Sequence, residues 1–146
     1  VVIVILAILA AALVPALLGY IDEARKSSYN EEAHSILTAL QVVEDEKYAA
    51  NVDPITTFQK GSSSSDAKQV VLDRVNRMID PTKLITATVT MKETPDTTKV
   101  THGEYTIKDI TELTFVSEKS KSGKCVKMKF VDNTWELVDE NADIPS

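Results

Sequence analysis

The chain contains few of the residues that usually constrain small exported or fibrous proteins. Of its 146 residues, one is cysteine, four are glycine, five are proline and 5% are aromatic. The single cysteine, Cys125, excludes an intramolecular disulfide. The low glycine and proline content excludes collagen-like and low-complexity sequences. The folded part must therefore be stabilised by its own core or by contacts with other copies of the chain.

A surplus of basic residues is also absent. The chain has 16 Lys and Arg residues against 22 Asp and Glu residues, and its formal net charge is -6. Binding to nucleic acid phosphates needs a basic surface, so no nucleic acid partner is predicted.

Charge of either sign is missing from the first part of the chain. No charged residue occurs from Val1 to Ile21, and Asp22 is the first. An apolar stretch of about 20 residues is long enough to cross the ~30 Å hydrocarbon core of a membrane as a helix. We therefore divide the chain into residues 1–21, an apolar transmembrane or filament-core segment, and residues 22–146, a soluble globular domain.

The helical pattern continues beyond this apolar stretch and becomes amphipathic over residues 22–51. Its apolar positions recur at steps of three and four residues: Ala24, Ser28, Ala33, Ile36, Leu37, Leu40 and Val43. Pro54 disfavours helix in the residue before it and so ends the pattern. A single helix of about 50 residues would be ~75 Å long, so half of it must protrude from a domain of this size.

Residues 52–83 are predicted to connect this helix to a sheet. The run Ser62–Ser65 is typical of a flexible surface loop, with glycosylation as the alternative interpretation. A short helix is predicted over Asp66–Ile79, with Ser65 as its cap. Its apolar side is predicted to comprise Val71, Val75, Met78 and Ile79.

Residues 84–146 are predicted to form an antiparallel sheet of roughly three to five strands and a tail. The expected strands are Leu84–Met91, Glu104–Lys108, Glu112–Ser117, Lys124–Val131 and Thr134–Val138, the last two joined by a turn at Asp132 and Asn133. Alternation assigns Val126, Met128 and Phe130 to one face and Cys125, Lys127 and Lys129 to the other; Trp135 and Leu137 are expected on the buried face. The fold class is therefore α+β, with the second half of the long helix packed against the sheet.

No pattern for catalysis or cofactor binding emerges. His34 and His102 have no ligand partners at metal-binding spacing, so both are interpreted as exposed. Cys125 is interpreted as a partly covered small residue, with a reactive thiol as the alternative. The acidic tail is interpreted as solvated, with calcium binding as the alternative; it comprises Asp132, Asp139, Glu140, Asn141 and Asp143. We predict a protein that is not an enzyme and has no cofactor.

The order of these segments is distinctive: an apolar helix with Pro15 near its middle, an amphipathic continuation, a connecting loop and an antiparallel sheet. The most characteristic residues are Ile8, Leu9, Ala10, Ala11 and Ala12, followed by Val14, Pro15 and Ala16, with Tyr20 further on. This sequence resembles the type IV pilin superfamily, which includes the pseudopilins of type II secretion systems. The likeness covers the first part of the chain closely and the remainder only in architecture.

The chain departs from the family pattern in two ways. It lacks about seven residues that begin mature pilins, including an acidic residue, and it lacks the leader before them. With one cysteine it also cannot form the C-terminal disulfide loop of many Gram-negative pilins. It is therefore most similar to cysteine-poor major pilins, such as those of Gram-positive bacteria.

The resemblance implies a structural subunit that polymerises into an extracellular type IV pilus. Its partners would be other copies of itself, the membrane before assembly, prepilin peptidase and the pilus assembly machinery. The implied location is the cell surface, after a single-pass membrane stage. The alternatives are a major pseudopilin and, from another class, a single-pass anchored extracellular binding domain.

The filament-core and membrane residues are assigned to the apolar half of the helix. They are Val1, Val2, Ile3, Val4, Ile5, Leu6, Ile8, Leu9, Leu13, Val14, Leu17 and Leu18. Pro15 removes one backbone donor and Gly19 weakens the helix, so a kink or local melting is expected at these two positions.

We expect replacement of Pro15 by Ala to lower filament yield, because the helix would lose the point at which it adapts between membrane and filament. Filament yield and amide hydrogen exchange around residue 15 would be measured. Unchanged yield together with unchanged local helicity would contradict a role for Pro15.

Overall fold

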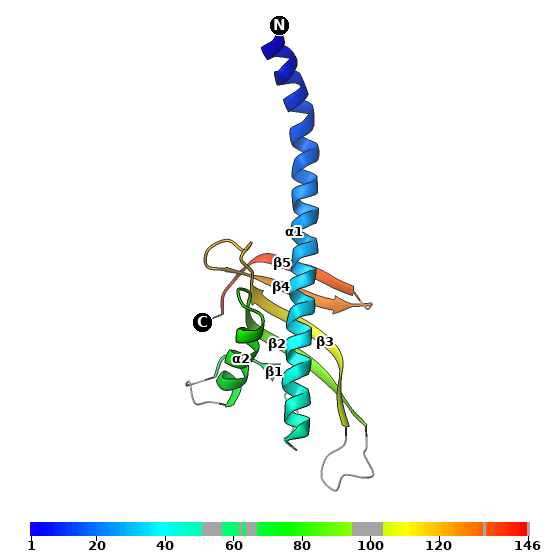
Figure 1. Cartoon of the computed structure of the whole chain (residues 1–146), viewed down its shortest axis with the longest axis vertical. Helices are drawn as coiled ribbons and strands as arrows, with labels where there is room; N and C mark the ends of the chain where they lie inside the picture. Colours follow the sequence, from blue (N-terminus) through cyan, green and yellow to red (C-terminus); the bar gives the residue numbers. More distant parts are fainter. Residues whose placement is uncertain (51–56, 62, 64–66, 95–103, 133, 146) are drawn as a thin grey trace.

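The computed structural model describes residues 1–50, 57–61, 63, 67–94, 104–132 and 134–145. Its elements follow the predicted order of a long helix, a short helix and an antiparallel sheet (Figure 1). They are α1 (Val2–Ala49), β1 (Thr57–Phe58), α2 (Ala67–Met78), β2 (Lys83–Thr94), β3 (Glu104–Val116), β4 (Lys124–Val131) and β5 (Thr134–Asp143). The predicted α+β class is confirmed.

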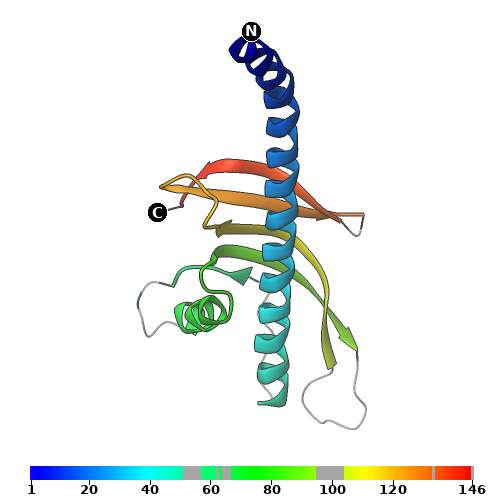
Figure 2. The ribbon, with the colours of Figure 1, turned by 45° about the horizontal axis from the view of Figure 1, so that its top comes forward.

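Helix α1 is the dominant element of the molecule. It has 48 residues, and at 1.5 Å per residue it is ~72 Å long. Its first half protrudes from the domain, whereas its second half lies across one face of the sheet (Figure 2). The helix continues unbroken through Pro15 and Gly19, and its N-terminal part curves gently in both views.

The five strands form one sheet in the order β1-β2-β3-β4-β5, with every neighbouring pair antiparallel. Strand β1 was not predicted, because its two residues lie within a polar connection. Phe58 nevertheless pairs with Ala87 of β2, and both side chains are buried. An isolated aromatic residue has no periodicity, so only its packing reveals it as core.

Strand β3 corrects the prediction of two separate strands at Glu104–Lys108 and Glu112–Ser117. A single strand spans this region, and its pairing with β2 shifts register between Thr88 and Val89 and again between Thr90 and Met91. Such irregularities insert unpaired residues and interrupt the alternation of side chains. The interruption in the sequence pattern therefore reflects bulges within a strand and not a break between strands.

The core lies between α1, α2 and the sheet. Its buried apolar residues are Tyr29, Ala33, Ile36, Ala39, Leu40, Val43, Phe58, Leu72, Val75, Ile79, Leu84, Ala87, Leu113, Phe115, Val126 and Met128. Trp135 and Leu137 pack against this cluster from β5, as predicted. Most of the expected apolar stripe of α1 is confirmed, but Ala24 is exposed because the core begins only at Tyr29.

Helix α2 matches its predicted range to within one residue at each end. One assignment on it was wrong: Met78 is 45% exposed, and Leu72, which was not predicted, faces the core with Val75 and Ile79. At 100° per residue Met78 is rotated away from the direction that Leu72, Val75 and Ile79 share. The predicted cap, Ser65, lies outside the described residues.

Polar contacts fix α1 and α2 on the sheet. The Glu32 carboxylate of α1 accepts hydrogen bonds from Thr82 Oγ1 at 3.2 Å and from Ser117 Oγ at 2.8 Å, and both donor residues are buried. The Asn76 side chain of α2 accepts from the backbone N–H of Leu84 at 2.7 Å and donates to its carbonyl at 3.3 Å. These contacts set the position of each helix more precisely than apolar packing alone can.

We expect replacement of Leu40 by Ala to reduce the free energy of unfolding by ~2–5 kcal/mol, because it leaves a cavity beneath α1. The exposed neighbour Gln41 is the matched control, and Gln41→Ala should change stability by less than about 0.5 kcal/mol. Urea unfolding of the detergent-solubilised protein measures both. Equal losses would contradict the assignment of Leu40 to the core.

Candidate functional site

The candidate site is the surface of the apolar half of α1. All twelve residues assigned to it are more than half exposed, from 52% for Ile5 to 97% for Val1. Tyr20 and Ile21 extend the same exposed surface to the boundary with Asp22. Within the described residues, no part of the sheet or of α2 covers this half of the helix, as Figures 1 and 2 show.

Exposure of such an apolar surface to water is unfavourable in free energy. Single-chain soluble domains seldom expose contiguous apolar patches of more than a few hundred Å², and larger patches mark contacts with membranes or other proteins. By length and composition, α1 is able to cross a membrane. None of the residues in its most apolar stretch is buried. Its backbone hydrogen bonds are internal to the helix, as a membrane or an apolar helix bundle requires. This half of α1 is thus compatible with a single-pass membrane anchor.

The domain begins where the charges begin. Arg25 on α1 lies 3.9 Å from the Asp22 carboxylate and 3.8 Å from the Glu140 carboxylate of β5. Asp22, Lys26, Val138 and Glu140 line a shallow groove between the helix and this edge strand. Sequence reasoning missed the contact between Arg25 and Glu140, because it joins residues far apart in the chain. The contact between Arg25 and Glu140 places β5 at the edge of the domain nearest the apolar half of α1.

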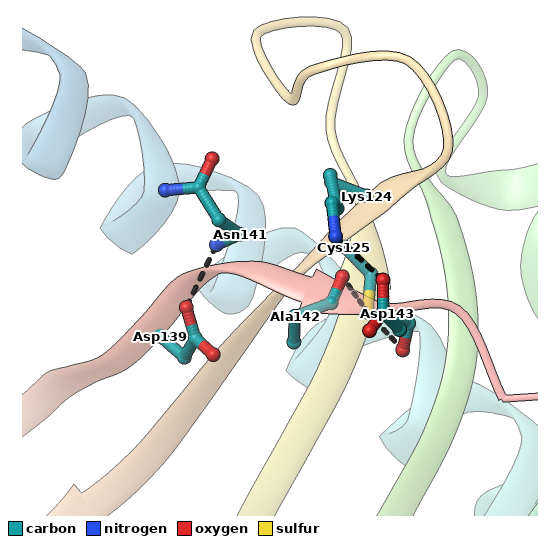
Figure 3. Close-up of polar contacts among 6 residues, drawn as sticks. All are labelled: Lys124, Cys125, Asp139, Asn141, Ala142 and Asp143. Atoms are coloured by element: carbon teal, nitrogen blue, oxygen red, sulfur yellow. Dashed lines mark hydrogen bonds and ion pairs between the residues drawn. The ribbon is translucent and has the colours of Figure 1, made fainter.

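Asp139 and Asp143 of the acidic tail have separate partners. Asp143 Oδ1 lies 2.5 Å from Lys124 Nζ, and Asp139 Oδ1 accepts a hydrogen bond from the backbone of Asn141 at 2.8 Å (Figure 3). Lys124 lowers the pKa of the Asp143 carboxyl, and Asp143 raises the pKa of Lys124. Within the described ranges, no group of three His, Cys, Asp or Glu side chains is placed to hold a metal ion. The calcium alternative therefore has no support from this geometry.

One of the two histidines lies in the described part of the chain. His34 is exposed on α1, as predicted. His102 lies outside the described residues.

Cys125 corrects the face assignment on β4. Its side chain is fully buried, although it was placed with Lys127 and Lys129 on the wet face. The pairing of β4 with β5 is irregular between Cys125 and Lys127, and β5 continues to Asp143, beyond its predicted end at Val138. The Cys125 thiol lies 3.5 Å from the carbonyl oxygens of Ala142 and Asp143 (Figure 3).

We expect Cys125 to resist thiol reagents in the folded protein. Burial raises the pKa of this thiol, so the reactive thiolate is scarce near neutral pH and increases as the pH rises. Maleimide labelling should be slow in buffer and rapid in guanidinium chloride, as followed by intact-mass spectrometry. Rapid labelling of the native protein would restore the alternative of a reactive cysteine.

The architecture of the chain, a long apolar N-terminal helix that continues onto an antiparallel sheet, is pilin-like. Comparison with protein-family models, with curated proteins and with solved structures finds no match to the chain.

Proposed function

We propose that this protein is a structural, non-enzymatic subunit that polymerises through the apolar half of α1 into an extracellular type IV pilus. The observation that carries the proposal is the exposure of every assigned apolar residue from Val1 to Leu18 on a helix that continues into a folded domain. A membrane anchor alone would also use such a surface. Two features favour a subunit that leaves the membrane to assemble. One is the resemblance to pilins around Ile8–Ala16, and the other is the sheet that covers one side of the second half of α1.

The energetics of this transfer support the proposal. In the membrane the apolar half is surrounded by lipid, and in a filament the same surface packs against the helices of other copies. Both environments exclude water, so exchanging one for the other costs little hydrophobic free energy. The sheet domain lies on one side of α1 and would form the outer surface of the filament.

We expect Leu9→Lys to abolish both membrane retention and filament formation, because a Lys at the centre of a spanning helix costs about 2.5–3.5 kcal/mol. The matched control is Val138→Lys, which adds the same charge at a 60% exposed apolar residue of β5. This control should retain both properties. Cell fractionation and electron microscopy of surface-sheared material measure them.

The same micrographs separate the alternatives. Long surface fibres support a pilus, and fibres confined to the periplasm would replace it with a pseudopilus. A wild-type protein that is retained in the membrane and forms no fibres would contradict the proposal in favour of a plain anchor.

A further inference from the structure

A groove lies on the domain beside the end of the apolar half of α1. One turn of the helix and a short stretch of β5 form it, and its volume is about 370 Å³. We call it the juxtamembrane groove, and its lining residues are Asp22, Lys26, Leu137, Val138, Asp139 and Glu140. Strand β5 is the strand nearest the N-terminal half of the helix (Figures 1 and 2). The groove therefore lies on the side of the domain that would face a membrane spanned by the apolar half.

The length of α1 sets the depth of this groove. The uncharged segment ends at Ile21, and its ~20 residues match the ~30 Å hydrocarbon core of a bilayer. Lys26 lies ~7.5 Å further along the helix axis, and the headgroup layer on each side of a bilayer is about 5–8 Å thick. Tyr20, which is 74% exposed, lies at the border where aromatic residues gather. The turn from Asp22 to Lys26 is thus at the level of the phospholipid headgroups.

An ammonium and a carboxylate remain without ion-pair partners in the groove. The Arg25 guanidinium lies 3.9 Å from the Asp22 carboxylate and 3.8 Å from the Glu140 carboxylate. In the described part of the chain, neither Lys26 nor Asp139 forms an ion pair. Both residues are exposed, one on the helix and the other on the strand. The groove therefore presents a positive group and a negative group to the same volume.

This arrangement suits a ligand that carries both charges. A headgroup with only negative charge would meet the carboxylates of Asp22, Asp139 and Glu140, which outnumber the nearby cations and repel it. A headgroup with a phosphate and an ammonium has a partner for each charge. Lys26 is placed for the phosphate, and the carboxylates are placed for the ammonium.

The lining of the groove also distinguishes between ammonium groups. A primary ammonium donates three hydrogen bonds, and carboxylates accept them. A quaternary ammonium such as that of choline donates none and is typically held by aromatic rings. The lining residues include carboxylates and no aromatic ring. The chemistry of the groove thus favours ethanolamine over choline.

We infer that the juxtamembrane groove binds the headgroup of phosphatidylethanolamine, an inference that rests on the membrane stage of the proposed function. Lys26 of α1 contacts the phosphate, and Asp139 and Glu140 of β5 contact the ammonium. A spanning helix alone leaves the domain free to tilt over the membrane surface. A second contact through β5 restricts this tilt and holds the subunit in one orientation before assembly.

Lipid retention tests the inference. The protein is reconstituted in vesicles that contain equal parts of phosphatidylethanolamine, phosphatidylglycerol and phosphatidylcholine, and is then extracted with mild detergent. Native mass spectrometry counts the lipids that remain bound. The wild-type protein should retain phosphatidylethanolamine roughly fivefold over either other lipid, the preference expected of partly exposed ion pairs.

A double variant and a matched control locate the site. Lys26→Gln together with Asp139→Asn should remove the preference for phosphatidylethanolamine. Lys129→Gln together with Glu136→Gln makes the same change of charge at two exposed residues that pair across β4 and β5 and do not line the groove. This control should keep the preference.

The depth of β5 is measured independently in the otherwise native protein. A nitrobenzoxadiazole label on Val138→Cys should be quenched strongly by a lipid that is spin-labelled at its headgroup. The same label on Asp73→Cys of α2 should be quenched weakly, because the neighbouring Arg74 pairs with Glu46 of α1, ~30 Å beyond Lys26 along the helix axis. Native Cys125 is buried and contributes little background.

Three results would overturn the inference: equal lipid retention by the wild type and the double variant, a preference for phosphatidylglycerol or phosphatidylcholine, or equal quenching at the two labelled positions. The proposed function stands in each case if the protein still spans the membrane and forms filaments. A wild-type protein that is not retained in the vesicles would overturn both.

Discussion

The structure depends on the packing of a single helix that is longer than the domain it belongs to. Helix α1 is ~72 Å long by its residue count, and the sheet covers only one side of its second half. Ile36, Leu40 and Val43 supply the helix side of the core, and the strands supply residues such as Leu113 and Phe115. The first half has no counterpart within the described chain. Its exposed apolar surface is compatible with a single-pass membrane anchor.

The position of the helix on the sheet is specified by polar contacts as well as by apolar ones. Glu32 accepts hydrogen bonds from Thr82, just before β2, and from Ser117, just after β3. These donors are buried, so removing the carboxylate would leave hydroxyl groups without an acceptor, at a cost of about 1–3 kcal/mol each. The contact therefore resists rotation of α1 about its axis. It keeps the buried face of α1 on the sheet and the opposite, exposed face directed away from it.

Strand β5 is the edge strand of the sheet that lies nearest the apolar half of α1, and its charged residues protect this edge. An edge strand presents unpaired backbone groups that are able to recruit other strands. Exposed charges along β5, at Glu136, Asp139 and Asp143, oppose such pairing. The Glu140 carboxylate instead lies 3.8 Å from Arg25 of α1, and this ion pair joins the edge strand to the helix. These charges and this ion pair oppose association of copies through the sheet edge.

Local sequence patterns were sufficient for the two helices and for the position of the hairpin of β4 and β5. The uncharged run to Ile21 and the three- and four-residue steps beyond it predicted α1 over nearly its whole length. The range of α2 and the hairpin of β4 and β5 also followed from local signals, because helix periods, stop residues and turn residues act over a few positions. The twelve apolar residues assigned to the first half of α1 are exposed, and their role in a membrane or filament stays a prediction.

The tertiary structure alone decided which residues are covered when local patterns conflict or are silent. Phe58 has no periodic neighbours, and Tyr29 lies between polar residues, yet both are buried because other elements pack over them. Cys125 alternates with core residues, but irregular pairing with an unexpectedly long β5 buries it as well. The contact of Arg25 with Glu140 joins residues more than a hundred positions apart. The sequence by itself thus determined the long helix and its apolar half, because those properties depend on neighbouring residues. The bulges of β3, the burial of Cys125 and the free face of α1 depend on strand register and on which side of the helix the sheet occupies, and folding alone fixes these.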